Sequence, residues 1–390
     1  MQVFHTESKI VITCNKRLSA YLQQEVEELG FTPTRVFQTG VELQGTVNDT
    51  IALNLNLRCG SQVLYLLKSF HAATPKELYD QLVEIEWENL IDFTGYFSVT
   101  SNVNNEHILT PLFANVKVKD AVADRIKTRK GLRPNSGPEL NKAVLHLYWQ
   151  DDKADIFIDT SGETLAKHSY RKIPGKAPML EALAASTIMA TNWDRKSTFI
   201  NPMCGSGTLA IEAALLATDK RPGLFRMNYA FMHIMGYDET VFFAERRKLK
   251  DKARKETGFK IIATDISDDA VDIARKNANT AGVEHLIDFA VCDFAETEVP
   301  EQPGVIMFNP EYGERLGVHT KLEITYKRVG DFLKQQCKGY RGYVFTGNPD
   351  LAKKIGLRPA RRIEFYNGKL DCRLFEYELY DGSKREPKQN

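Results

Sequence analysis

The amino-acid sequence predicts an α/β protein, in which a mostly parallel, doubly wound sheet follows smaller α+β modules. From about residue 170, short apolar strands alternate with helical patterns, which is typical of a parallel sheet with helices on both faces. Before that point, helices and strands follow one another in an order that favours antiparallel pairing. Near the C-terminus, Asn367-Gly368 separates two alternating runs, which predicts that the sheet ends in a β-hairpin.

The length of the chain, 390 residues, exceeds one ordinary hydrophobic core and predicts two or three domains. We expect an N-terminal unit at 1–60, an α+β domain at 61–165 and the doubly wound domain at 166–390. In the first, KIVITC predicts a strand, RLSAYLQQEVEELG a helix and TRVFQTGVELQG further strand. In the second, ELYDQLVEIEW and ANVKVKDAVADRIKTRKG predict helices, and YFSVTSNV, AVLHLYWQ and KADIFIDT predict an antiparallel sheet.

The third domain repeats a strand followed by a helix. The predicted pairs are STFINPMC with GTLAIEAALLAT, KIIATDIS with DAVDIARKNANTAG, and GVIMFNP with a helix over 321–338. IDFAVCDF and YRGYVFTG predict further strands, and RRIEFYNGKLDCRLFEYELY predicts the hairpin.

Composition restricts the class of protein. The sequence is 43% hydrophobic and 26% charged, as in soluble globular proteins, and no window approaches the roughly 20 apolar residues of a membrane helix. The N-terminus lacks the pattern of a secretory signal, so we expect a cytoplasmic protein. The six cysteines are scattered without metal-ligand spacing, which predicts reduced thiols and no metal site. The net charge of +1 means that any nucleic-acid surface must be local.

A glycine turn follows the first strand of the third domain. In NPMCGSGTLAIEAA, Gly205 and Gly207 allow a tight turn and close approach of a ligand to the backbone, and the next helix adds N-terminal donors. A dinucleotide site would require a third glycine and an acidic residue about 20 positions further on. Here residue 210 is alanine and Asp265 comes much later, so an NAD site is disfavoured.

Acidic residues end the next two strands. Asp265 can accept both ribose hydroxyls of a nucleoside. Asp293 can accept from an adenine amino group, with Phe294 beside the ring. Each residue alone is more often a helix cap or loop residue. A glycine turn and two aspartates at successive strand ends, with Asn309 at a fourth, together favour S-adenosylmethionine (SAM) as cofactor.

The stretch FNPEYGERLG suits methylation of an exocyclic amino group on a nucleobase. The lone pair of such a nitrogen is delocalised into the ring, and two acceptors, the Asn309 side chain and the carbonyl that Pro310 aims, can localise it. Tyr312 can stack on a base taken out of its helix. Glu311 stands where such loops usually carry a second proline. Because neither acceptor depends on that side chain, we expect Glu311 to be tolerated, facing solvent or a basic partner such as Arg315.

These motifs resemble a known family over essentially the whole chain. The matching stretches are VKDAVADRI, DTSGETLAKHSYRK, GKAPMLEALAA, NPMCGSGTLAIEAA, PGLFRMNYAF and FNPEYGERLG. The chain resembles the bacterial THUMP-domain guanine-N2 methyltransferases of large-subunit ribosomal RNA, the RlmL type in its short form. The resemblance implies a ferredoxin-like unit, a THUMP RNA-binding domain and a Rossmann-like class I SAM methyltransferase domain. The family's fused second methyltransferase is not part of this sequence, so only the N2-guanine activity is implied.

The resemblance also implies roles for individual residues. Asn309, Pro310 and Tyr312 would be catalytic, and Pro178 and Met179 would cover the methionine end of the cofactor. The predicted cofactor contacts are Pro178, Met179, Pro202, Cys204, Gly205, Ser206, Gly207, Asp265, Ile266, Asp293, Phe294 and Asn309.

Basic residues in the second domain indicate RNA as partner. The run RIKTRKGLR has five basic residues and no acidic one, although such a run is often only a solvated helix end. The predicted RNA contacts are Lys117, Lys119, Arg125, Lys127, Arg129, Lys130, Arg133, Arg171 and Lys172. We favour 23S ribosomal RNA. Transfer-RNA guanine-N2 methylation, N6-adenine methylation of DNA and a non-catalytic RNA-binding assembly factor remain alternatives.

Overall fold

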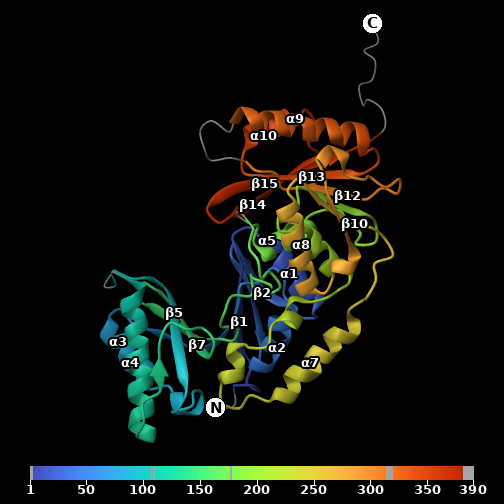
Figure 1. The fold of residues 1–390 in the computed structure, drawn as a ribbon. Helices are drawn as coiled ribbons and strands as arrows, with labels where there is room; N and C mark the ends of the chain where they lie inside the picture. Colours follow the sequence, from blue (N-terminus) through green and yellow to red (C-terminus); the bar gives the residue numbers. More distant parts are fainter. Residues whose placement is uncertain (1–2, 107, 109, 176–177, 313–318, 381–390) are drawn as a thin grey trace. The chain divides into compact units, whose positions relative to one another are not determined.

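The computed structural model describes residues 3–106, 108, 110–175, 178–312 and 319–380. The chain forms two compact units (Figure 1). The first comprises Met1–Lys167 and Arg221–Asp251, and the second comprises His168–Lys220 and Lys252–Asn390. No helix in the described part of the chain is sufficiently long and apolar to span a lipid bilayer.

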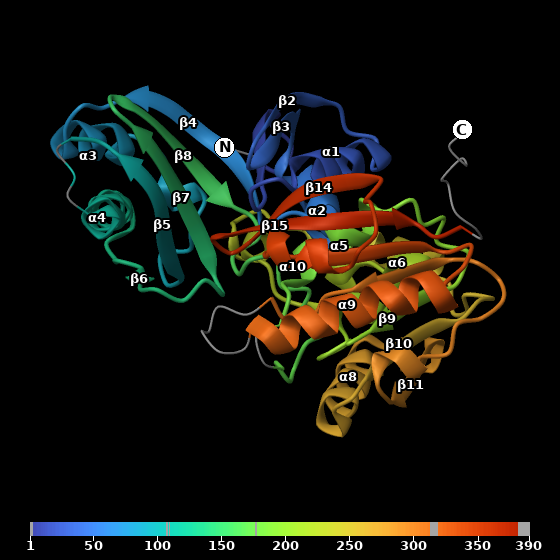
Figure 2. The same ribbon diagram turned by 90° about the horizontal axis from the view of Figure 1, so that it is seen from above.

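The first unit is built on one eight-stranded sheet with the order β2-β3-β1-β4-β8-β7-β5-β6. Helices α3 and α4 pack together against its β5 side (Figure 2). The elements are β1 (Ser8–Thr13), α1 (Ser19–Glu28), β2 (Pro33–Phe37), β3 (Gly40–Gly45), α2 (Val47–Asn56), β4 (Gln62–His71), α3 (Pro75–Val83), η1 (Trp87–Asn89), β5 (Tyr96–Asn104), α4 (Pro111–Lys130), β6 (Asn135–Ser136), β7 (Ala143–Gln150), β8 (Lys153–Asp159), η2 (Pro222–Phe225), η3 (Ala230–His233) and α7 (Glu239–Lys252).

Three features of this unit differ from the sequence prediction. Strand β4, which was not predicted, pairs with both β1 and β8, so the two predicted modules share one sheet. The second module is also not purely antiparallel, because β5 pairs in parallel with β7. Helix α2 was missed although its start carries a local signal. Thr46 accepts from the Asp49 amide while the Asp49 carboxylate accepts from the Thr46 amide, which is a capping box.

A buried carboxyl group at the end of β8 makes the stability of this unit depend on pH. Asp159 Oδ1 accepts from the Ser161 and Gly162 amides at 2.9 and 3.1 Å, and its Oδ2 has no hydrogen-bond partner among the described residues. Burial raises the pKa of Asp159 to about 7, from 3.8 in an exposed aspartate. The folded state therefore favours the protonated form. The contribution that protonation of Asp159 makes to the free energy of unfolding is complete below pH 3.8 and is lost as pH rises towards 7.

We accordingly expect Asp159→Asn to remove most of this pH dependence. Between pH 5 and 8 the wild type should lose about 3 kcal/mol of unfolding free energy relative to the variant, because only the two pH units below the folded-state pKa contribute fully. Urea unfolding at both pH values measures the difference. Asp151→Asn is the control, because Asp151 is exposed in the turn between β7 and β8 and asparagine tolerates its positive φ. Equal pH dependence of wild type and Asp159→Asn would contradict the prediction.

The second unit has a seven-stranded sheet with the order β11-β10-β9-β12-β13-β15-β14. All pairs from β11 to β13 are parallel, and β15 is antiparallel to both β13 and β14, as predicted. The elements are α5 (Glu181–Met189), β9 (Phe199–Pro202), α6 (Thr208–Ala217), β10 (Ile261–Asp265), α8 (Asp268–Ala281), η4 (Glu284–Leu286), β11 (Ile287–Val291), η5 (Phe294–Glu296), β12 (Val305–Phe308), α9 (His319–Gln336), β13 (Arg341–Thr346), α10 (Pro349–Lys354), β14 (Arg361–Asn367) and β15 (Leu370–Glu378).

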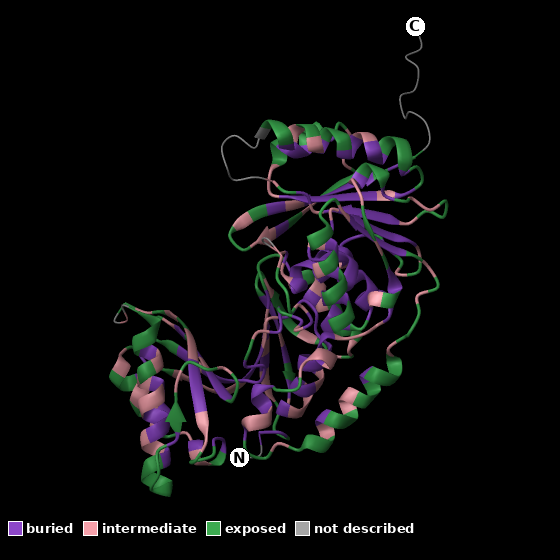
Figure 3. Cartoon of the chain, in the orientation of Figure 1, coloured by how far each residue is buried: buried purple, intermediate pink, exposed green. Residues whose placement is uncertain are grey.

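Helices cover both faces of this sheet. Helices α9 and α10 lie on one face, and α5, α6 and α8 lie on the other (Figures 1 and 2). The central strands β9, β10, β12 and β13 are largely buried, while the outer side of α9 is exposed (Figure 3). Strand β9 is bordered by β10 on one side and β12 on the other, so the strand order reverses there. In open α/β sheets, ligands bind at the carboxyl ends of the strands beside such a reversal.

Candidate active site

The turn between β9 and α6 has a backbone conformation that favours glycine. Met203, Gly205 and Gly207 have positive φ values. A Cβ on Gly207 would lie 2.8 Å from Ala274 Cβ of α8, so this glycine allows the turn to pack closely. A Cβ on Gly205 would meet nothing within 4 Å. The turn therefore packs against α8 at Gly207 and leaves space beside Gly205.

Asp265, the last residue of β10, is joined to this turn. Its Oδ2 accepts from the Gly205 amide and its Oδ1 from the Ser267 amide, both at 3.0 Å. Each carboxylate oxygen keeps acceptor capacity, so a fixed Asp265 can still receive ribose hydroxyls. Ile266 beside it is 74% exposed.

Asp293 lies beyond the end of β11 and forms an ion pair with Arg328 of α9. The Asp293 Oδ1 accepts from Arg328 and from the Ala295 amide, at 2.8 and 2.9 Å. Burial works to raise the pKa of Asp293, but these two hydrogen bonds outweigh it and hold the pKa below its usual value. Phe294 was predicted to lie beside adenine, but it is only 5% exposed and packs edge-on against Phe308. This corrects its role to a core residue, because its ring is buried under α9.

Asn309 follows β12 directly. Its Oδ1 is buried and has no hydrogen-bond partner in the described part of the chain. Pro310 is buried and Glu311 is exposed, which agrees with a carboxylate that faces solvent. The Tyr312 hydroxyl accepts from Asn367 at 2.9 Å. Arg315, the suggested partner of Glu311, lies outside the described residues.

A second asparagine was missed by the sequence analysis. Asn201 of β9 is 1% exposed and donates to the Met307 carbonyl of β12 at 2.9 Å. Its Oδ1 also lacks a partner among the residues that the structure describes. A polar residue inside the apolar strand TFINP was the available signal. Asn201 ties the two strands together where the strand order reverses.

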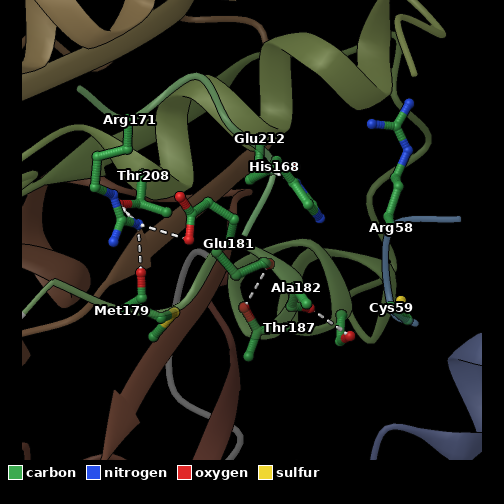
Figure 4. A network of polar contacts seen from close by, with 12 residues as sticks. Arg58, Cys59, His168, Arg171, Met179, Glu181, Ala182, Thr187, Thr208 and Glu212 are labelled. Carbon is green, nitrogen blue, oxygen red and sulfur yellow. Dashed lines mark hydrogen bonds and ion pairs between the residues drawn. The ribbon is translucent and has the colours of Figure 1, made fainter. Parts of the chain in front are cut away.

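The segment that includes Pro178 and Met179 is fastened by Arg171. The Arg171 guanidinium donates to the Met179 carbonyl at 2.5 Å and to Thr208 Oγ1 at 2.9 Å, and it lies 3.5 Å from Glu181 (Figure 4). The side chain is only 10% exposed. This corrects the RNA contact predicted for Arg171, because the guanidinium points inward. The Arg171 side chain thus joins the segment that includes Pro178 and Met179 to Thr208, the first residue of α6.

Asn277 of α8 holds the chain before that segment, at Lys172 and Ile173. Its Oδ1 accepts from the Lys172 and Ile173 amides, and its Nδ2 donates to the carbonyls of Ile173 and Ser206. Asn277 is fully buried on the apolar face of α8, which is the sequence signal that could have identified it. In the same unit, His168 Nδ1 lies 2.7 Å from Glu212 Oε1, and both side chains are fully buried (Figure 4).

The side chains predicted to contact RNA differ in their exposure to solvent and in their contacts with other residues. Arg125 is 13% exposed and ion-paired with Glu88 at 3.0 Å, so it chiefly holds α4 in place. Lys127, Arg129, Lys130 and Lys172 are exposed. Lys117 lies over the Phe113 ring, Lys119 donates to the Gly137 carbonyl, and Arg133 pairs with Asp120.

Comparison with known proteins places the site in context. Family models match as an RlmL ferredoxin-like domain over residues 9–64, a THUMP domain over 72–159 and an RMKL-like methyltransferase domain over 168–376. These matches confirm the predicted fold class and resemblance.

Individual relatives agree with these models. The ribosomal RNA large subunit methyltransferase K/L of Syntrophotalea carbinolica is 33% identical over 95% of this chain and 53% of its own length. The protein of the same name from Methylococcus capsulatus is 34% identical over 94% and 50%. The chain thus spans about half the length of these curated relatives. The solved structure of a putative methyltransferase complexed with SAH has a TM-score of 0.86 and 26% identity, and covers 97% of this chain and 99% of its own.

Proposed function

The chain belongs to the RMKL-like methyltransferase family, and from this membership we propose that it is a SAM-dependent RNA methyltransferase. We further propose that its target is the exocyclic N2 amino group of a guanosine in 23S ribosomal RNA, in the cytoplasm. The observation that carries the proposal is the buried, unpartnered Asn309 Oδ1 at the end of β12, because the described residues offer it no donor. The names of the curated relatives support ribosomal RNA as the substrate.

The residues at the carboxyl edge of the sheet fit SAM. Asp265 would receive the ribose hydroxyls, Asp293 the adenine amino group, and the open side of Gly205 leaves room for the methionine portion. Arg171 and Asn277 would hold the covering segment around it. Bound SAM supplies a methyl group activated by its attachment to a sulfonium.

Asn309 would then prepare the guanine nitrogen for attack. Its Oδ1 and the Pro310 carbonyl accept the two amino hydrogens, which draws the nitrogen lone pair out of conjugation with the ring. Tyr312 stacks on the extruded base and holds it in line with the methyl group. The Glu311 side chain is exposed, so we keep the expectation that it is tolerated.

Methyl transfer from labelled SAM tests the proposal. The acceptor is total RNA from cells that lack this gene, followed by nucleoside mass spectrometry of separated ribosomal and transfer RNA. N2-methylguanosine in the large-subunit RNA is the expected product. Label in transfer RNA would overturn the substrate but keep the chemistry. Cofactor binding without any methyl transfer would favour a non-catalytic RNA-binding protein.

We expect reversal of the charges of Arg129 and Lys130 to weaken RNA binding. Both are exposed at the end of α4, where contacts to phosphates release counterions. Arg129→Glu with Lys130→Glu should lower the slope of log affinity against log salt by about 2. The control is Arg247→Glu with Lys248→Glu, which makes the same charge change on the exposed face of α7. Equal losses in both double variants would mean that only overall charge matters.

A further inference from the structure

The catalytic loop is tied to the C-terminal hairpin. The Asn367 side-chain amide of β14 donates to the Tyr312 hydroxyl at 2.9 Å, although 55 residues separate the two. The hydroxyl of the proposed base-stacking ring is therefore held by strand β14 of the hairpin.

The part of the hairpin that holds Tyr312 is itself firmly packed. Strand β15 pairs with β13 up to Thr346, which lies opposite Arg373. Cys372 is fully buried, and a Cβ on Gly347 would lie 2.6 Å from the Leu370 side chain. Because the neighbouring strands are fixed in this way, Asn367 can hold the Tyr312 hydroxyl in one position.

The hairpin turn does not require an asparagine at this position. The final pair of the ladder is Asn367 with Leu370, so the two central turn residues are Gly368 and Lys369. Gly368 has a φ of +62°, whereas Asn367 is not among the residues with positive φ. Glycine at the first central position is typical of a type II′ turn. Asn367 is a strand residue, so the geometry of the turn does not account for an asparagine at this position.

We infer that Asn367 is a positioning residue that fixes the direction of the long axis of the Tyr312 ring before the target base arrives. The inference rests on the proposed function, in which that ring stacks on the extruded guanine. Tyr312 is only half-buried, so its ring retains an exposed surface for a base. Without the hydrogen bond, the ring must be ordered when RNA binds, and ordering a side chain at that moment weakens binding and misaligns the reacting nitrogen.

A double-mutant cycle of Asn367→Ala and Tyr312→Phe tests this inference. Each single variant should lower kcat/KM for RNA about tenfold, the loss expected for one ordinary hydrogen bond. The double variant should be no worse than Tyr312→Phe, because loss of the hydroxyl already removes the contact that Asn367→Ala removes. KM for SAM should not change in any of them. Losses that multiply, or a raised KM for SAM, would overturn the inference.

Two further variants separate positioning from general damage. Asn367→Asp keeps the shape and can accept a hydrogen bond from the Tyr312 hydroxyl, so it should restore most activity, whereas Asn367→Leu should not. Asn279→Ala, on the exposed side of α8, should behave as wild type. Failure of Asn367→Asp to exceed Asn367→Leu would count against the inference. Inactivity of the wild type on all RNA would instead refute the proposed function, and with it the stacking role of Tyr312.

Discussion

Replacing Asn309 with alanine is expected to lower the rate of methyl transfer about 10³-fold while the affinity for SAH falls far less. The loss is large because the side-chain oxygen would act on the developing charge at the target nitrogen, where one preorganised contact is worth about 10²- to 10³-fold. The cofactor contacts proposed here are made by other strand ends, at Gly205, Asp265 and Asp293.

Single-turnover methylation of RNA and calorimetric titration with SAH measure the two quantities separately. Asn309→Asp keeps an acceptor oxygen and should retain more activity than Asn309→Ala. Glu311→Gln is the control, because the Glu311 side chain is exposed next to the same loop. Parallel losses of rate and of SAH affinity in Asn309→Ala would make Asn309 chiefly a cofactor ligand.

Replacing Arg171 with methionine is expected to destabilise the second unit by about 3 kcal/mol and to weaken SAH binding. The substitution leaves the Met179 carbonyl and the Glu181 carboxylate without their charged donor, and Glu181 is only 4% exposed. Breaking a buried ion pair on one side costs about 3–5 kcal/mol because the remaining charge is uncompensated. The covering segment would also lose its connection to α6.

Lys172→Met is a matched control for this prediction, because the neighbouring Lys172 is exposed. It should leave stability and SAH affinity unchanged. A second replacement, Glu181→Met, should recover much of the stability lost in Arg171→Met, since apolar pairs replace buried ion pairs well. Urea unfolding and titration with SAH provide the measurements. A weakened affinity for RNA in Arg171→Met, with normal stability, would restore the surface role that the sequence suggested.

The strands, helices and strand ends were predicted correctly where hydrophobic periodicity and residue chemistry indicate the same structure. Alternation of strand and helix after residue 170 gave the parallel sheet, and the strand ends gave the positions of Asp265 and Asn309, because carboxyl ends of parallel strands meet at one edge. The hairpin was predicted from Asn367-Gly368, but the turn is centred one residue later. That shift is invisible in sequence, since both registers place glycine in the turn.

The remaining site residues could not be identified from local pattern. Arg171 and Lys172 are adjacent and equally basic, yet one is buried against Met179 and Thr208 while the other faces solvent. Phe294 follows a predicted cofactor residue, but the packing of α9 buries it. Both outcomes depend on elements distant in the chain, about which a short motif carries no information.

The sequence by itself determined the fold class and the family resemblance, and it predicted the chemistry of the Asn309 loop, because these depend on periodicity and on residue types at strand ends. The tertiary structure decided which polar groups are shared between distant segments. The packing of the chain brings together Asp265 and Gly205, Asn277 and Lys172, and Asn367 and Tyr312. Such pairings follow from how helices and strands pack across the sheet, and burial then favours a partner for most polar groups.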